Sequence, residues 1–229
     1  MNVLQSWFAF LGKWGPTYLS GMLVTLKISF FGVLIGFVLG LLIALMRRSR
    51  IKPLEWLAKA YVEVFRGTPL LVQVLIAYYG FAAIIPETYG SLKNPFVLSM
   101  FAICMNSSAY VSEIIRGGIN AVDRGQGEAA ASLGMTKKQT MRHIILPQAV
   151  KTVLPALGNE FVTLIKESAI VAFVGIEDIM FEAKVVAGAT YLPFMPYITA
   201  ALIYFVLVFS LSKLLGIAER RMANSDSRA

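Results

Sequence analysis

Side chains that hold metals, form disulfides or carry out acid–base chemistry are scarce in this 229-residue sequence. Its one cysteine, Cys104, excludes an internal disulfide and a cysteine-cluster metal site. Its one histidine, His143, excludes an HExxH zinc motif and makes an acid–base triad improbable. The sequence also lacks a GxxxxGK[ST] phosphate-binding loop and a GxSxG nucleophile elbow. We therefore expect no metal, no cofactor and no catalytic site in this chain.

Charge is also scarce, since charged residues make up 15% of the chain and hydrophobic residues make up 57%. A soluble domain of this size cannot bury so much apolar surface, so we expect a lipid bilayer to cover much of it. The charged residues fall in clusters between apolar stretches, which is typical of a multi-span membrane protein. The net charge of +8 follows from these basic loops, and we expect no nucleic-acid partner.

Long apolar stretches are common in the sequence. Four of them contain no Asp, Glu, Lys or Arg, and each has about the 20 residues that a membrane-spanning helix needs: 28–46, 67–86, 94–112 and 185–212. A fifth candidate, residues 148–176, is interrupted by four charged residues: Lys151, Glu160, Lys166 and Glu167. Hydropathy alone therefore leaves the fifth span undecided.

The distribution of basic residues decides the number of spans. Segments 47–66 and 113–151 hold six Lys or Arg residues each, and the tail 213–228 holds four. Five spans put sixteen basic residues inside and four outside, whereas four spans would put the basic tail outside. We predict an all-α integral membrane protein of a single domain (1–229), with the N-terminus outside and the C-terminus in the cytoplasm. The predicted spans are about 19–46, 64–86, 94–115, 148–176 and 187–214.

Two shorter patterns concern helix packing and a helix start. Glycines at every fourth position, Gly32, Gly36 and Gly40, predict close approach of another helix, which the sequence does not identify. Residues 66–69 predict the cytoplasmic start of the second span, with Pro69 in its first turn.

A polar, Ala-rich segment lies between the third and fourth predicted spans. Residues 125–135, GQGEAAASLGM, predict a short helix with Glu128 in its first turn and Gly134 as its left-handed stop. Thr136 and Gln139 then form a capping box, so a second helix begins at once and runs toward a bend or restart at Pro147. Spacing alone supports equally a docking surface for another protein and an ordinary helical loop.

The motif within this segment resembles that of a known family. Residues 128–147 resemble the EAA signature of ABC importer permeases, EAA-x3-G-x9-I-x-LP. The stretches 61–73, 106–126 and 157–171 resemble permeases for polar amino acids. The resemblance implies a type I ABC importer permease-like fold, with a coupling helix at about 126–136 that fits a cleft on an ATPase subunit. It assigns the coupling role to Glu128, Ala129, Ala130, Gly134, Ile144, Leu146 and Pro147.

The resemblance also implies the partners. They are two ABC ATPase subunits, a second permease subunit and an extracytoplasmic amino-acid-binding protein, in a bacterial cytoplasmic (inner) membrane. A homodimer is favoured, because one chain carries a full set of polar residues within its spans, and a heterodimer remains the alternative.

Polar residues of the fourth span are the candidates for substrate binding, because ionisable groups inside a membrane are costly. Glu160, Thr163 and Glu167 share one helical face, and Lys166 belongs to a neighbouring polar stripe. A glutamate suits an ammonium group, and Lys166, or backbone N–H groups freed by a helix break near Ser168, suits a carboxylate. The resemblance places Lys166, Glu167 and Ser168 near the family's binding site. Four residues of the third span form the expected second wall: Asn106, Ser107, Ser108 and Tyr110.

The leading hypothesis is a permease subunit of an ATP-driven importer for a polar L-amino acid. An excess of carboxylates favours a basic, arginine-like substrate, with glutamine and cystine as alternatives. Two other classes stay open: a membrane scaffold that only docks a partner, in which Glu160 and Lys166 would merely pair with other helices, and an ion-driven carrier without ATPase coupling. The polar stripes argue against the scaffold, and the absence of an inverted repeat argues against the carrier.

Overall fold

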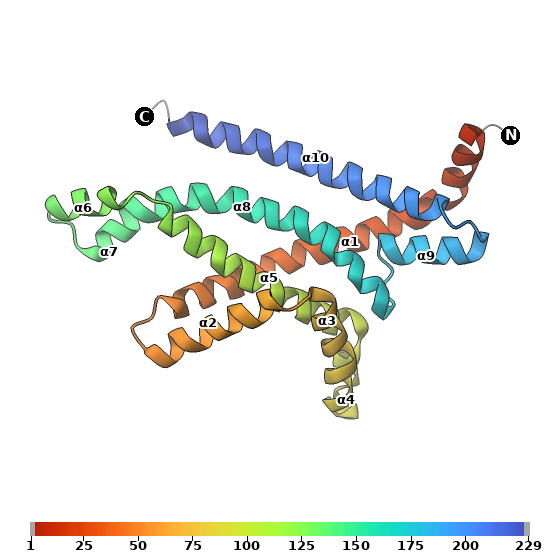
Figure 1. The fold of residues 1–229 in the computed structure, drawn as a ribbon, viewed down its shortest axis with the longest axis horizontal. Helices are drawn as coiled ribbons and strands as arrows, with labels where there is room; N and C mark the ends of the chain where they lie inside the picture. The colour runs from red at the N-terminus through yellow and green to blue at the C-terminus, as the bar shows by residue number, and fades with distance from the viewer. Residues whose placement is uncertain (1–2, 227–229) are drawn as a thin grey trace. The chain divides into compact units, whose positions relative to one another are not determined.

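The computed structural model describes the backbone of residues 3–226 and the side chains of residues 5–221. Over this range the protein is all-helical, as predicted (Figure 1). The α-helices are α1 (Val3–Arg47), α2 (Lys52–Gly67), α3 (Leu70–Leu75), α4 (Ala82–Ile84), α5 (Pro95–Asn120), α6 (Arg124–Ser132), α7 (Lys137–Thr140), α8 (Leu146–Glu167), α9 (Ile179–Thr190) and α10 (Met195–Asp226). Turns of π-helix (Ile76–Phe81, Met141–Ile145) and 3₁₀-helix (Glu87–Lys93, Ser168–Val174) link some of them.

Three helices are long and apolar enough to cross a membrane on their own: Gln5–Arg47 of α1, Pro95–Asn120 of α5 and Met195–Arg221 of α10. The segments Lys52–Gly67 and Leu70–Ile84 make a fourth crossing if the two together form one broken span. Helix α8 falls outside this set, in keeping with the charges that interrupt residues 148–176. The five-span topology therefore stays a prediction.

The chain groups into two compact units, each built from three separate stretches of sequence. The described residues of the first unit are 3–32, 69–103 and 162–211. Those of the second unit are 33–68, 104–161 and 212–226. Helices α1, α5, α8 and α10 each contribute residues to both units, so each unit is described on its own below.

The core of the first unit joins α9 to the early part of α1 and the early part of α10 (Figure 1). Tyr18 is buried there, and its hydroxyl donates a hydrogen bond of 2.9 Å to the carbonyl oxygen of Pro196. The buried residues of this core are Phe10, Tyr18, Ile179, Ala183, Val186 and Ala200. Apolar packing thus holds α9 against the two longer helices, and the hydrogen bond from Tyr18 to Pro196 joins α1 to α10.

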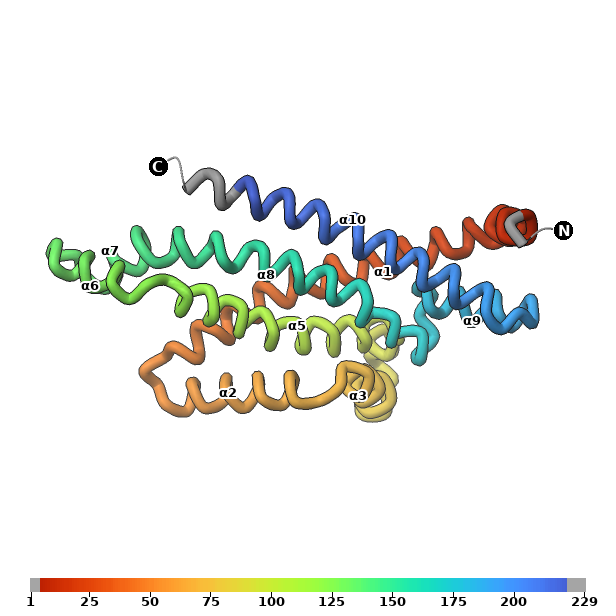
Figure 2. The backbone as a smooth tube through the Cα atoms, turned by 45° about the horizontal axis from the view of Figure 1, so that its top comes forward, coloured from red at the N-terminus to blue at the C-terminus, as the bar shows by residue number. Residues whose placement is uncertain are grey.

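The core of the second unit joins the last part of α1 to α5 and α8, and Figure 2 shows α5 and α8 running side by side. Its buried residues are Ala44, Val111 and Ile115. Gly36 and Gly40 are the points of closest approach. A Cβ at Gly36 would lie 2.8 Å from Oγ of Ser107, and one at Gly40 would lie 2.8 Å from the carbonyl oxygen of Ser108. The packing role predicted for these two glycines is confirmed, and their partner is α5.

The chain breaks its helix between α2 and α3, at the position where the sequence predicts a span to continue. Thr68 has an extended backbone (φ −119°, ψ 145°) because the residue before a proline is disfavoured in the α region. Pro69 is the N-cap of α3, with Leu70 as the first helical residue. Residues 64–67 therefore end α2, where the sequence predicts the beginning of the second span.

Candidate functional site

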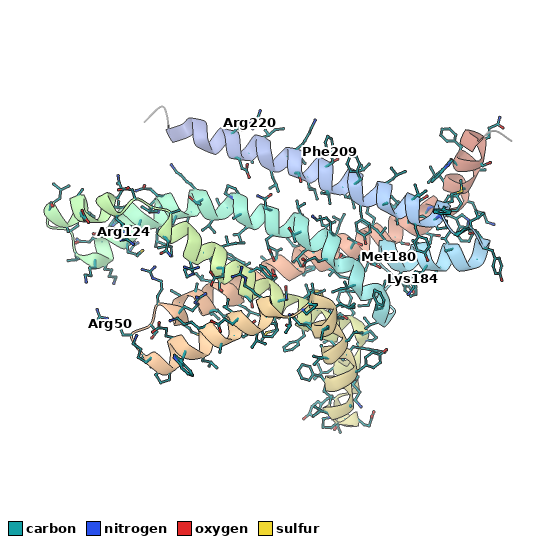
Figure 3. The ribbon with its side chains drawn as sticks, in the orientation of Figure 1. Arg50, Arg124, Met180, Lys184, Phe209 and Arg220 are labelled. Carbon is teal, nitrogen blue, oxygen red and sulfur yellow. The ribbon has the colours of Figure 1, made fainter. Side chains whose placement is uncertain are left out.

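Helix α6 of the second unit contains the first half of the motif. Asp123 is its N-cap, and Oδ1 of Asp123 accepts a hydrogen bond of 2.7 Å from the N–H of Gly125. The helix begins at Arg124, which Figure 3 labels. The predicted placement of Glu128 in the first turn is wrong, because the Asp123 cap starts the helix earlier than the glycine-rich residues suggest.

The turn after α6 has the predicted geometry. Gly134 has φ +80°, a left-handed conformation that favours glycine. Thr136 and Gln139 form the predicted capping box: Oγ1 of Thr136 accepts from the N–H of Gln139 at 3.3 Å, and Oε1 of Gln139 accepts from the N–H of Thr136 at 2.9 Å. After α7 and a π-helical turn the chain restarts as α8 at Leu146, with Pro147 in its first turn. Local signals therefore fix this helix–glycine–helix element.

The surface of this element is open. Glu128, Ala129 and Gly134 are exposed, and a Cβ at Gly134 would meet no atom within 4 Å. Ala130 is the anchor of α6, since only 3% of its surface is exposed. Leu133 is 83% exposed at the tip. The residues of the motif thus form a small apolar knob, with no described residue of this chain covering Leu133.

A polar cluster in the second unit brings together three of the predicted substrate residues. Ser107 of α5 is fully buried, and its hydroxyl donates to Oε1 of Glu160 on α8 at 3.1 Å. Ser108 is also fully buried, and its hydroxyl lies 2.6 Å from that of Tyr61 on α2. The Tyr61 hydroxyl donates to the carbonyl oxygen of Met105 at 2.8 Å. Tyr61 has no predicted role, although it opens the 61–73 stretch of the resemblance.

The other two residues of the predicted second wall also contact α2 within this unit. The side-chain amide of Asn106 donates to the carbonyl oxygen of Phe65 at 3.1 Å. The guanidinium of Arg66 lies over the ring of Tyr110, with 5.2 Å from Cζ to the ring centroid. The serine-rich turn of α5 therefore ties α2 and α8 together, which is the structural alternative to substrate contact.

The remaining four predicted substrate residues belong to the first unit. Lys166 and Glu167 are exposed, Thr163 is half-buried, and Ser168 is 1% exposed. The Ser168 hydroxyl donates to the carbonyl oxygen of Ile165 at 3.0 Å. Helix α8 ends at Glu167 and a 3₁₀ turn begins at Ser168, as expected from the sequence. Lys166 and Glu167 thus lie at the end of α8, where the chain changes from α-helix to a 3₁₀ turn.

Glu113 is the centre of a charge cluster in the second unit that the sequence does not reveal. Its carboxylate receives two hydrogen bonds from Arg116 (2.5 Å from Nη2 and 3.0 Å from Nε). Arg47 of α1 forms an ion pair with the same carboxylate, and Arg66 of α2 approaches it to 3.9 Å. Only the pair with Arg116, three residues apart on one helix, is predictable from spacing.

Asp178 of the first unit is a second carboxylate that the sequence does not single out. It is fully buried, and as the N-cap of α9 it accepts from the N–H of Phe181 at 2.8 Å. The hydroxyl of Tyr204 donates to its other oxygen at 3.1 Å. Burial raises the pKa of Asp178 from 3.8 to about 6, and these two hydrogen bonds lower it only in part.

Comparisons with known proteins agree with the geometry of the motif. Residues 32–224 match the family described as binding-protein-dependent transport system inner membrane component. The chain belongs to this family, which comprises the permease subunits of ABC importers, and ATP is hydrolysed by a separate subunit in these systems. The predicted resemblance is thereby confirmed.

Three individual proteins are similar over nearly the whole chain. The arginine transport system permease protein ArtQ of Bacillus subtilis (strain 168) is 44% identical over 211 residues, covering 92% of this chain and 94% of ArtQ. A putative glutamine transport system permease protein, GlnP of Rickettsia bellii (strain RML369-C), is 43% identical over 218 residues, covering 94% and 98% of the two chains. A chain in the crystal structure of an amino acid ABC transporter with histidines has a TM-score of 0.87 and 50% identity, covering 93% of this chain and 98% of that chain.

Proposed function

We propose that this chain is the permease subunit of an ATP-driven importer that carries a polar L-amino acid across a bacterial cytoplasmic membrane. The observation that carries the proposal is the open helix–glycine–helix element of α6 and α7, with Leu133 and Ala129 exposed at its surface. An apolar knob on an otherwise polar segment suits a cleft in another protein. In this role the ATPase pushes on α6, and the permease subunits alternate access by rigid-body movement.

The proposed topology has five spans, with the N-terminus outside and the C-terminus in the cytoplasm. The long apolar helices α1, α5 and α10 supply three spans, and the segment Leu70–Ile84, the second half of the broken pair, supplies a fourth. Helix α8 is the remaining span, whose charges are tolerated because they face protein or a polar path. The excess of basic residues in 47–66, 113–151 and 213–228 supports this orientation.

The proposed substrate is a basic amino acid, arginine first. A relative named for arginine is 44% identical, and a structure described as holding histidines is 50% identical. Glutamine is the second candidate, supported by the 43% identity to a putative glutamine permease. The proposed contacts are Glu160 or Glu167 for the ammonium and Lys166 or the N–H groups near Ser168 for the carboxylate. Thr163, Asn106, Ser107, Ser108 and Tyr110 complete the set.

The proposed assembly contains two permease subunits, two ATPase subunits and an extracytoplasmic binding protein. A homodimer of permeases is favoured over a heterodimer, because one chain supplies both carboxylates and donors within its spans. Substrate-stimulated ATP hydrolysis in vesicles, measured with the ATPase and the binding protein present, tests the whole proposal. If no amino acid stimulates hydrolysis under these conditions, the importer function is wrong.

The docking surface has its own test. Leu133→Glu places a charge on the exposed tip of the knob without disturbing any buried contact. We expect the amount of ATPase that co-purifies with the tagged permease to fall about tenfold or more, as at an interface hot spot. Leu192→Glu is the matched control, since Leu192 is also exposed but lies in the loop after α9. Equal recovery of ATPase with Leu133→Glu and with the control would contradict docking at α6.

A further inference from the structure

A hollow of about 420 Å³ opens on the first unit, and none of the residues proposed above for substrate or coupling lines it. Three segments line it: α1, the start of α5, and the link between the 3₁₀ turn and α9. The lining residues are Val24, Lys27, Asn94, Pro95, Phe96, Gly175, Ile176 and Glu177. Its size lies within the range of about 300–1,000 Å³ that is usual for small-molecule sites.

The two charged residues that line the hollow, Lys27 and Glu177, have opposite charges. Among the described residues, neither Lys27 nor Glu177 forms an ion pair, and both side chains are exposed. Elsewhere in the same unit Lys93 and Glu87 form an ion pair with each other, at 2.5 Å. Lys27 offers donors for a carboxylate, and Glu177 offers acceptors for an ammonium. The hollow therefore presents both charges that complement a zwitterion.

A polar group at the start of α5 extends this pattern. Oδ1 of Asn94 accepts a hydrogen bond of 2.8 Å from the N–H of Phe96, while the NH₂ group of Asn94 donates to no described residue. Asn94 lines the hollow, so its NH₂ group offers a further donor for a carboxylate.

We propose that this hollow is an entry subsite for a free α-amino acid, which binds its carboxylate through Lys27 and its ammonium through Glu177. The inference rests on the proposed function, whose topology counts Lys27 among the outer basic residues and has Asn94 and Glu177 at the outer ends of the third and fourth spans. The subsite is distinct from the polar residues of α8, and it holds the zwitterion before it reaches them. Because both charged groups are exposed, the binding is weak and screened by salt.

Equilibrium dialysis of radiolabelled L-arginine against the intact permease–ATPase complex in nanodiscs, without binding protein, tests the subsite. The variants are Lys27→Gln and Glu177→Gln, and the matched controls are Lys93→Gln and Glu87→Gln. Each subsite variant should raise the Kd about threefold to fivefold at low salt, and the controls should leave it unchanged. Agmatine, which lacks the carboxylate, should be weakened only by Glu177→Gln. N-acetyl-arginine, which lacks the free ammonium, should be weakened only by Lys27→Gln.

The outcomes separate the subsite from the proposed function. If both variants bind L-arginine as the wild type does, the subsite is wrong, whereas substrate-stimulated ATP hydrolysis by the wild type still supports the importer. If the wild type shows no stimulated hydrolysis but the two variants still weaken arginine binding as expected, the subsite stands and the importer falls. If the variants leave arginine binding unchanged but weaken association with the binding protein in a separate pull-down, the two residues form a protein contact and the subsite is wrong. If Lys27→Gln or Glu177→Gln is not monodisperse, Lys27→Arg or Glu177→Asp is used in its place. These conservative variants should raise the Kd less than the glutamine variants do.

Discussion

Asp178 in the first unit and Glu113 in the second unit are both shielded carboxylates, but the partners of the two differ in charge. Asp178 accepts hydrogen bonds from a backbone N–H and a tyrosine hydroxyl, which are neutral. Glu113 has three guanidinium groups within 3.9 Å. Burial without a cation makes the first unit sensitive to pH, whereas the second unit depends on one carboxylate to offset several positive charges. The same residue class thus serves two different electrostatic purposes in one chain.

The largest effect is expected for Glu113→Gln. Removal of the carboxylate charge leaves Arg47, Arg66 and Arg116 close together without an opposite charge, and the Glu113 side chain is only 16% exposed. We expect a loss of about 3 kcal/mol or more in the free energy of unfolding, because one partner of a shielded ion pair is missing. Thermal unfolding of the complex in nanodiscs measures it. Glu177→Gln, at an exposed position of the first unit without an ion pair among the described residues, is the control, and equal melting of the two variants would show that the cluster contributes nothing.

The pH dependence of stability separates the two units. The pKa of Asp178 is raised from its ordinary value of 3.8 to about 6 in the folded protein, so the folded state binds the proton more tightly than the unfolded state does. The stability from this group is fully present below about pH 4 and is lost as the pH rises through 6, by up to about 3 kcal/mol. Asp178→Asn removes this dependence and keeps a residue that can cap α9.

Unfolding of the wild type and of Asp178→Asn, followed between pH 4.5 and 7.5, measures this difference. Asp123→Asn is the matched control, since it makes the same change at the exposed N-cap of α6 and should follow the wild-type profile. A profile for Asp178→Asn that coincides with the wild type would mean that Asp178 does not titrate in this range.

A smaller effect is expected where packing, and not charge, holds the second unit together. Gly36→Ala would place a Cβ 2.8 Å from the Ser107 hydroxyl, which itself donates to Glu160. We expect a loss of about 1–3 kcal/mol from overpacking. Gly12→Ala in the same helix meets nothing within 4 Å and should instead stabilise α1, by up to about 1 kcal/mol. Circular dichroism melts of both variants decide the sign, and stabilisation by Gly36→Ala would contradict the close contact.

Sequence reasoning succeeds where the determining residues are neighbours in the chain. The Gly134 turn, the Thr136–Gln139 capping box and the restart at Leu146 depend on residues within one or two turns of each other, and all are present. It fails for the partner of Gly36, for Tyr61 and for the Glu113 cluster. These contacts join residues of different helices that lie 44 to 71 positions apart in the sequence. The sequence assigns the candidate substrate residues to two spans, the third and the fourth, but the hydrogen bond from Ser107 to Glu160 depends on tertiary packing.

The early start of α6 shows a further limit, of a local kind. The sequence predicts Glu128 in the first turn, yet Asp123 caps the helix, so that Gly125 and Gly127 lie in the first turn and Glu128 follows it. A side chain that satisfies the first N–H groups offsets the low helix propensity of glycine, which costs about 1 kcal/mol per residue. Boundaries of short helices therefore depend on caps as much as on composition.

The bare leucine at the tip of the motif has a consequence for the cell. In the proposed topology, a permease chain made in excess of its ATPase would expose Leu133 to the cytosol, where chaperones and proteases select exposed apolar side chains. The permease would then escape degradation only when the ATPase is made in matching amounts. Leu133 would thus serve both for docking in the complex and for recognition of the unassembled subunit.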